Sequence, residues 1–266
     1  MSLSMNSHDL AYIINWFNLY GDSFSTPVIE DQRNITLKQV HSEHVRKNAL
    51  RIAQDLGLNS EATALAEAAG LLHDVGRFEQ YRQYKTFHDS VSINHGTLGA
   101  QVLREQGVLG VLSEHDREMI IRCVSLHNVF IIPSGVDAES LHYVRLVRDA
   151  DKLDILRVFL DYYNQDEATR AGAVALGLPD TPGYSSEVLS SLMHGNMVKM
   201  SQLRTLNDFK LLQLAWLYDL NFKSSFAMVI ERDYIRHLSA HLPQTPDIFQ
   251  AIAILNEYVE KALCKP

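Results

Sequence analysis

His73 and Asp74 stand side by side at the end of an apolar, alanine-rich stretch that runs from Ala62 to Leu72. Both side chains are costly to bury without a partner, so their position calls for a compensating interaction. A metal ion is the strongest candidate, because imidazole nitrogens and carboxylate oxygens together suit divalent transition metals. The alternative is a helix-terminal histidine beside an aspartate that bonds backbone amides. The pair predicts a metal site if other parts of the chain supply more ligands.

Further candidate ligands lie on the apolar faces of predicted helices, three or four residues from aliphatic neighbours. They are His41, His95, His127 and Asp151. Taken singly, a histidine on such a face is more often a hydrogen-bonded core residue. Asp151 could instead form a buried ion pair with Arg148 or Lys152. Together with His73 and Asp74, however, these residues form too many exceptions to the burial rules for one core, and a shared metal site explains all of them.

The residue types narrow the choice of metal. Imidazoles and carboxylates without thiolates suit Mn, Fe, Co, Ni or Zn. The set is also larger than one ion usually takes from protein when it keeps a position open for water. Two ions bridged by a carboxylate, about 3.5–4 Å apart, would use every ligand. We therefore expect one or two divalent transition metal ions, with Fe or Mn first and Ni, Co, Zn or Mg as alternatives.

The elements that position these ligands are all predicted to be helices. Helical spacing of apolar residues predicts helices near residues 10–20, 36–56, 60–72, 95–103, 114–127 and 138–163. Others follow at 187–193, 206–220, 226–238 and 246–263. No segment shows sustained strand alternation, so the predicted fold class is all-α. Gly76 is interpreted as a helix stop, residues 77–93 as an irregular loop beside the site, and residues 166–184 as a connecting loop.

Composition limits the partners. The chain has 266 residues, 46% of them hydrophobic, and a net charge of −8. This charge argues against a nucleic-acid polymer as partner, since such binding rests on clustered basic residues. We find no apolar run of roughly 18 residues that could span a bilayer, and no signal peptide. Two distant cysteines, Cys123 and Cys264, indicate reduced thiols. These features favour a cytoplasmic protein that makes no membrane contact.

The order of the candidate ligands resembles that of the HD-domain superfamily of metal-dependent phosphohydrolases, in its two-metal form. The resemblance covers about residues 35–163, and the local strings that carry it are Lys38-Gln-Val-His41, Leu71-Leu-His-Asp-Val-Gly-Arg77, His95-Gly-Thr-Leu-Gly99 and Arg148-Asp-Ala-Asp-Lys-Leu-Asp154. It implies an N-terminal helix and linker at 1–34, a metal-binding helical core at 35–165, and a C-terminal helical extension at 166–266 that packs on the core.

The resemblance also implies roles for individual residues. One ion would be held by His41, His73, Asp74 and Asp151, with Asp74 bridging to a second ion on His95 and His127. Asp74 would thereby be catalytic. His44 competes with His41 in this alignment, although the helical stripe favours His41. Arg77 and Lys152 are the cations nearest the ligands in sequence, so they could contact a substrate phosphate, or equally form surface ion pairs.

Three functions fit this pattern. The leading hypothesis is hydrolysis of a small phosphate ester or anhydride, such as a nucleotide, by a metal-activated water. A di-iron oxygenase of the HD-domain type would use the same ligands. A non-enzymatic, metal-containing module that senses a ligand is the third, although purely structural metal sites usually close their coordination. A homodimer is compatible with the aromatic C-terminal helices, which could equally cover the core.

Overall fold

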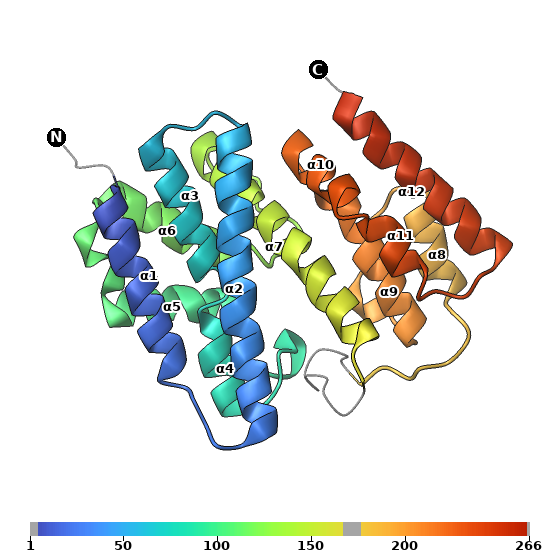
Figure 1. The fold of residues 1–266 in the computed structure, drawn as a ribbon, viewed down its shortest axis with the longest axis horizontal. Coiled ribbons are helices and arrows are strands. Elements are labelled where there is room, and N and C mark those ends of the chain that lie inside the picture. Colours follow the sequence, from blue (N-terminus) through green and yellow to red (C-terminus); the bar gives the residue numbers. More distant parts are fainter. Residues whose placement is uncertain (1–4, 167–176, 265–266) are drawn as a thin grey trace. The chain divides into compact units, whose positions relative to one another are not determined.

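The computed structural model describes residues 5–166 and 177–264, and over these residues it is helical and contains no strand (Figure 1). The prediction of an all-α fold is confirmed. The chain divides into two compact units, and the change from the first to the second falls between Asp154 and Ile155, inside one long helix. The predicted boundaries at 34/35 and 165/166, and the packing of the extension on the core, stay predictions. No helix among the described residues is both long and apolar enough to cross a membrane.

The first unit contains the helices that carry all of the candidate ligands. In chain order they are α1 (Ser7–Asp22), α2 (Ile29–Asp55), α3 (Ser60–Leu72), α4 (Gly76–Tyr84), the 3₁₀ turn η1 (Asp89–Val91), α5 (His95–Gln106), η2 (Val108–Val111), α6 (Glu114–Leu126) and the first part of α7 (Ala138–Asn164). Side-chain oxygens cap several of these helices. Asn59 accepts from Ala62 N, Asn94 from Thr97 N and Ser113 from Asp116 N.

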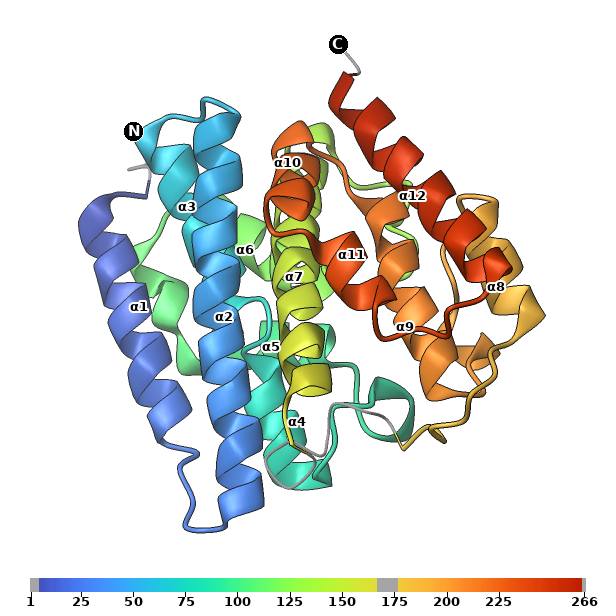
Figure 2. The ribbon, with the colours of Figure 1, turned by 45° about the vertical axis from the view of Figure 1, so that its right-hand side comes forward.

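Helix α3 is the centre of the first unit, where it packs against α1, α2 and α6. Both views show α1, α2 and α3 side by side (Figure 1 and Figure 2). Its small residues make this possible, since every position from Ala64 to Leu72 is buried. At Gly70 an added Cβ would lie 2.9 Å from the Cβ of Ala49 on α2. The alanine-rich sequence therefore buries the whole C-terminal half of α3 and delivers His73 into the interior.

The predicted loop at 77–93 is wrong in its first half, because α4 occupies Gly76–Tyr84. Gly76 begins this helix rather than ending the previous one; α3 has already ended at Leu72. Phe78 and Tyr81 are spaced three residues apart and both are buried. The residues between them are polar and the helix is short, so the spacing of apolar residues does not reveal this buried face. Beyond Lys85, which has a positive φ of 55°, the chain leaves the helix and only η1 interrupts the irregular segment.

The second unit begins with the rest of α7 and continues with α8 (Ser186–Met193), η5 (Met200–Gln202), α9 (Leu206–Ala215), η6 (Trp216–Asp219), α10 (Lys223–Glu231), α11 (Tyr234–Ser239) and α12 (Pro246–Cys264). Here α8 and α12 pack together, and α9 packs against α8 and α11. The single helix predicted at 226–238 is two, because Asp233 adopts a left-handed φ of 53° between them. Within the predicted loop at 166–184, residues 167–176 lie outside the described part of the chain.

Candidate metal centre

The structure brings all six predicted ligands together inside the first unit. They come from five places in the helical scaffold: His41 from α2, the pair His73 and Asp74 from the residues after α3, His95 from the first residue of α5, His127 from the residue after α6, and Asp151 from α7. Five are buried, and the side chain of Asp151 is 14% exposed. Helix ends supply most of these positions, so the residues project inward where the backbone turns.

The first half of the cluster surrounds one oxygen of Asp151. Its Oδ1 lies 3.1 Å from Nε2 of His41 and 3.4 Å from Nε2 of His73. Oδ2 of Asp74 faces the same two nitrogens at 3.6 Å and 3.7 Å. We call these four residues (His41, His73, Asp74 and Asp151) the first sub-site.

The second half of the cluster uses the other oxygen of Asp74. Oδ1 of Asp74 lies 3.3 Å from Nε2 of His95 and 3.6 Å from Nε2 of His127. We call Asp74, His95 and His127 the second sub-site. The carboxylate of Asp74 therefore spans the two halves, one oxygen in each, which is the arrangement that a bridging ligand requires.

The hydrogen bonds of the histidines test whether this cluster fits a metal. All four rings direct Nε2 inward, while Nδ1 of each lies against an oxygen outside the cluster. Those oxygens are Oδ2 of Asp154 for His41 at 2.8 Å, the carbonyl of Gly70 for His73 at 2.7 Å, Oδ2 of Asp89 for His95 at 2.7 Å, and the carbonyl of Val124 for His127 at 2.8 Å. Metal-binding histidines almost always donate their second nitrogen in this way, and the donation fixes the tautomer.

Asp151 adds a second sign of fit. Its Oδ1 is buried and accepts no hydrogen bond within the described residues, even though two imidazole nitrogens approach it. Such a short approach without hydrogen-bond geometry is what results when several ligands point at one central position rather than at one another. The donor set, with four imidazoles, two carboxylates and no thiolate, fits divalent transition metal ions.

The electrostatics of the cluster favour a bound cation. Burial would raise the pKa of Asp74, but Lys38, His73 and Arg77 hold it well below its usual range. Burial and Lys38 would lower the pKa of His41, yet Asp151 and Asp154 raise it to about 9. The first sub-site is therefore negative enough to bind a proton strongly, and a divalent ion would be bound by the same charges.

Lys38 and Arg77 both contact the carboxylate of Asp74. Nζ of Lys38 donates to Oδ2 of Asp74 at 2.7 Å, while Nε of Arg77 lies 3.4 Å from Oδ1 of the same carboxylate. Arg77 thus lies beside the cluster, and its predicted contact with a substrate phosphate stays a prediction. Lys152, the other predicted substrate contact, is a buried residue of α7 that is 8% exposed, and its predicted role stays a prediction.

His41, rather than His44, occupies the cluster. His44 lies three residues further along α2, its side chain is 43% exposed, and Nδ1 lies 3.4 Å from Oδ1 of Asp154. Asp154 therefore contacts both histidines, but only His41 turns its other nitrogen toward the ligands. The helical stripe of α2, which puts His41 on the buried face, correctly separates the two.

The sequence argument assigns no individual role to Lys38, Asp89 or Asp154, although Lys38 and Asp154 belong to strings that carry the resemblance. Two of them could have been found from spacing. Lys38 precedes His41 by three residues and Asp154 follows Asp151 by three, so each pair shares a helix face. Asp89 offers no such signal, because it lies in an irregular segment.

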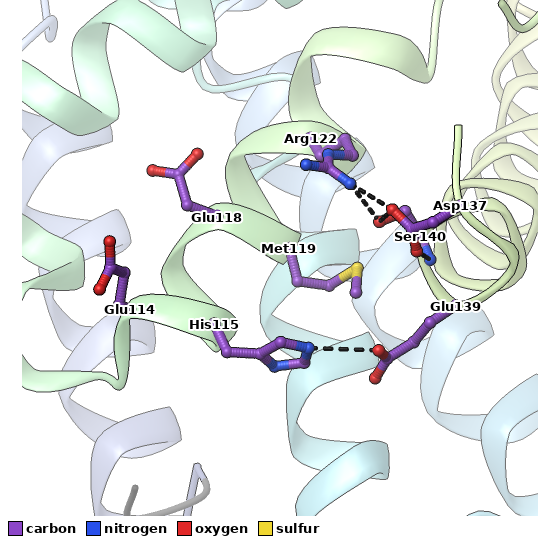
Figure 3. A pocket seen from close by; sticks show the side chains of 8 residues that line it. All are labelled: Glu114, His115, Glu118, Met119, Arg122, Asp137, Glu139 and Ser140. Carbon is purple, nitrogen blue, oxygen red and sulfur yellow. Dashed lines mark hydrogen bonds and ion pairs between the residues drawn. The ribbon is translucent and has the colours of Figure 1, made fainter. Parts of the chain in front are cut away.

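A separate hollow of about 320 Å³ lies along α6 and the start of α7 (Figure 3). Its lining contains none of the six predicted ligands, and it is formed by Glu114, His115, Glu118, Met119, Arg122, Asp137, Glu139 and Ser140. Four of its charged groups form pairs: His115 lies 3.2 Å from Glu139, and Arg122 donates to Asp137 as well as to Ser140 (Figure 3). These mutual pairs give no indication of a ligand.

Comparison with known proteins finds a family match over the residues that form the cluster. The family described as "HD domain" matches residues 39–156, a range that contains all six predicted ligands. No curated protein and no solved structure matched the chain.

Proposed function

Because residues 39–156 are an HD domain, and this domain belongs to a superfamily of metal-dependent hydrolases, we propose that the protein hydrolyses a small phosphate ester or anhydride, with nucleotides among its candidate substrates. One observation carries the proposal. The carboxylate of Asp74 presents one oxygen to each sub-site and is flanked by two cations, Lys38 and Arg77. Donor sets for two metals next to positive charge suit a reaction at a phosphoryl group.

The residues of each sub-site would divide the metal ligands between them. His41, His73 and Asp151 would hold one ion, His95 and His127 the other, and Asp74 would bridge. When bound, such ions lower the pKa of water and neutralise charge on phosphoryl oxygens. The protein fixes the ligand positions beforehand, because each imidazole is already oriented through Nδ1.

Arg77 is suited to bind the phosphate itself. Its Nη1 donates to Oε1 of Gln80, the carbonyl of Phe87 and Oδ1 of Asp89, at 2.8, 2.6 and 3.0 Å. Its Nε is buried, forms no hydrogen bond within the described residues, and lies beside Asp74. The guanidinium is therefore anchored at one end, while its Nε edge is directed at the cluster. An oxyanion bound there would gain charge-assisted hydrogen bonds.

Lys38 would hold Asp74 in place and add a second positive charge. Its ammonium lies 5.0 Å from the centre of the Phe87 ring, and the guanidinium of Arg77 lies 5.7 Å from the same ring. The two cations thus contact one aromatic ring and the two oxygens of one carboxylate. This arrangement concentrates positive charge beside the ligands, although the chain as a whole carries a net charge of −8.

A panel of phosphorylated metabolites tests the proposal. Protein loaded with Mn or Fe should release phosphate from at least one small ester or anhydride, and His73→Ala should lose this release while its far-UV circular dichroism stays native. An inert protein, or a His73→Ala variant that matches the wild type, would contradict the proposal. Substrate-dependent oxygen uptake by the iron-loaded protein would instead support the oxygenase alternative, which uses the same donors.

A further inference from the structure

The carboxylate of Asp89 contacts four residues in and beside the second sub-site. Its Oδ2 lies 2.7 Å from Nδ1 of His95 and accepts from Nδ2 of Asn128 at 3.1 Å. Its Oδ1 accepts from Nε2 of Gln80 at 2.9 Å and from Nη1 of Arg77 at 3.0 Å. One carboxylate therefore joins α4, the first residue of α5 and the residue after His127.

We infer that Asp89 is the positioning residue of the second sub-site, and that it couples metal binding there to anion binding at Arg77. The inference deepens the proposed function, and it rests on the two-metal arrangement of that proposal. Asp89 would touch neither metal nor substrate. It would act through His95 on one side and through Arg77 on the other.

The contacts of the four histidines show why His95 needs such a residue. His73 and His127 are oriented by carbonyls three residues earlier in their own chain segments, and His41 by Asp154, which is buried in α7. Among these four, His95 is the one oriented by a short segment between helices, because Asp89 lies in η1. The second sub-site is complete only when residues 85–94 are in place.

Two side chains of α4 hold residues 85–94 in place. Gln80 donates to Asp89, to Oγ of Ser92 and to the carbonyl of Ile93, each at 2.9 Å. Arg77 donates to Asp89 and to the carbonyl of Phe87. The guanidinium that faces Asp74 through Nε therefore fixes this segment through Nη1. An anion at the Nε edge and a metal on His95 both depend on the same geometry.

The coupling is reciprocal by thermodynamic linkage. An anion that holds Arg77 in place favours the position of Asp89 in which His95 faces the second sub-site. A metal on His95 favours the same position of Asp89, and so the same guanidinium orientation. Inorganic phosphate should therefore increase the affinity of the protein for the second ion, and the second ion should increase its affinity for phosphate.

The first test measures Mn²⁺ binding without substrate, by equilibrium dialysis and elemental analysis. The wild type should bind two ions, and His95→Ala, which removes the ligand itself, should bind one. Asp89→Asn keeps the size of the side chain but loses the charge. It should lower the affinity for the second ion about 10–100-fold and leave the affinity for the first ion unchanged. Asp89→Glu keeps the charge and should lower the affinity for the second ion less. If Asp89→Asn does not fold, Asp89→Glu is the variant whose ion binding tests the inference.

Asp31→Asn is the matched control. Asp31 accepts hydrogen bonds from Lys85 and from Tyr81, so it helps to anchor the same segment. These bonds involve neither His95 nor Arg77. It should bind two ions as the wild type does. The inference is overturned if Asp89→Asn keeps a normal second ion, if it loses both ions while folded, or if Asp31→Asn shows the same defect.

The second test uses inorganic phosphate as the probe. Phosphate should increase the affinity of the wild type for its second ion, and this increase should fall about tenfold in Arg77→Met, the value of one hydrogen bond to a charged group. An equal increase in Arg77→Met would overturn the coupling. Failure of the proposed function is distinguishable, since a protein that hydrolyses no phosphate ester could still bind two ions and lose one in Asp89→Asn.

Discussion

Nε2 of His95 and Nε2 of His127 lie 2.9 Å apart, yet neither nitrogen has a proton to donate to the other. Nδ1 of His127 lies against a carbonyl oxygen, which can only accept, so its proton is assigned to Nδ1. Nδ1 of His95 likewise donates to Asp89. Burial, followed by the charge of Arg77, lowers the pKa of His95 to about 3, and burial also lowers the pKa of His127. Both rings are thus neutral, with their lone pairs facing.

Two facing lone pairs at this distance repel unless a cation lies near both. In the first sub-site the same nitrogens of His41 and His73 lie 3.2 Å apart, but there the raised pKa of His41 lets its imidazolium donate through Nε2 to His73. There the carbonyl of Gly70 assigns the proton of His73 to Nδ1, so its Nε2 must also accept. The paired imidazoles of the two sub-sites are therefore arranged to bind positive charge, and each pair shares an oxygen of Asp74.

Removal of the metal should destabilise the protein. Ions that bind only the folded state add about 2.7 kcal/mol of stability at a free concentration of 100 times Kd. For a chain of this size, that corresponds to a rise in Tm of roughly 5–10 °C. Thermal unfolding followed by circular dichroism should show this rise when Mn²⁺ is added to EDTA-treated, dialysed protein. An identical Tm with and without metal would contradict a site that binds ions in the folded state.

The cluster of candidate ligands could be predicted because polar residues stand on, or at the end of, apolar helical patterns. His41 and Asp151 interrupt apolar stripes, and the long helices α2 and α7 contain enough turns for those stripes to be clear. Helical spacing fixes which face a side chain occupies, so residues from separate helices could be assigned to one interior. Distances between them could not be predicted, because these depend on how the helices pack.

Two contacts could not be predicted, that of Asp89 with His95 and that of Lys38 with Asp74, and the reasons differ. Asp89 lies in an irregular segment, where no periodicity indicates the direction of a side chain. Lys38 lies on a helix, but a lysine near the start of an amphipathic helix is usually a solvated surface residue. Only the structure shows that Lys38 turns toward Asp74. Helix α4 was missed because nine residues contain too few apolar positions to show a stripe.

Gly76→Ala should destabilise the first unit. A Cβ at this position would meet the carbonyl oxygen of His95 and would lie 2.5 Å from the backbone nitrogen of Gly99. These are backbone atoms of α5, so they could move only if the helix moved. We expect a loss of about 1–3 kcal/mol, as for overpacked cores, measured by urea denaturation.

Gly110→Ala is the control for this substitution. Gly110 lies in η2, and an added Cβ there would have nothing within 4 Å. Its free energy of unfolding should change by less than about 0.5 kcal/mol, as for ordinary surface substitutions. Equal stability of Gly76→Ala and Gly110→Ala would show that α4 and α5 approach less closely than the structure indicates.

The two cysteines should differ in reactivity. Both are free thiols; Cys264 is exposed, whereas Cys123 is buried in α6 and burial raises its pKa to about 12. At pH 8 almost no Cys123 would be thiolate, which is the reactive form. A chromogenic disulfide reagent should therefore label one thiol per chain in the native protein and two in denaturant. Rapid native labelling of both would contradict the buried position of Cys123.

Arg77→Lys should weaken substrate binding even though the charge is kept. A lysine ammonium cannot replace the fork of Arg77, which bonds Phe87 and Asp89 through Nη1 while Nε faces Asp74. The loss of hydrogen bonds to a charged group, about 1.5–3 kcal/mol, predicts a 10–100-fold fall in kcat/KM for a phosphate ester. Lys85→Arg is a suitable control, since Lys85 bonds Asp31 outside the cluster and its side chain is 56% exposed. If steady-state kinetics give the same kcat/KM for Arg77→Lys as for this control, the Nε edge of Arg77 does not bind the phosphate.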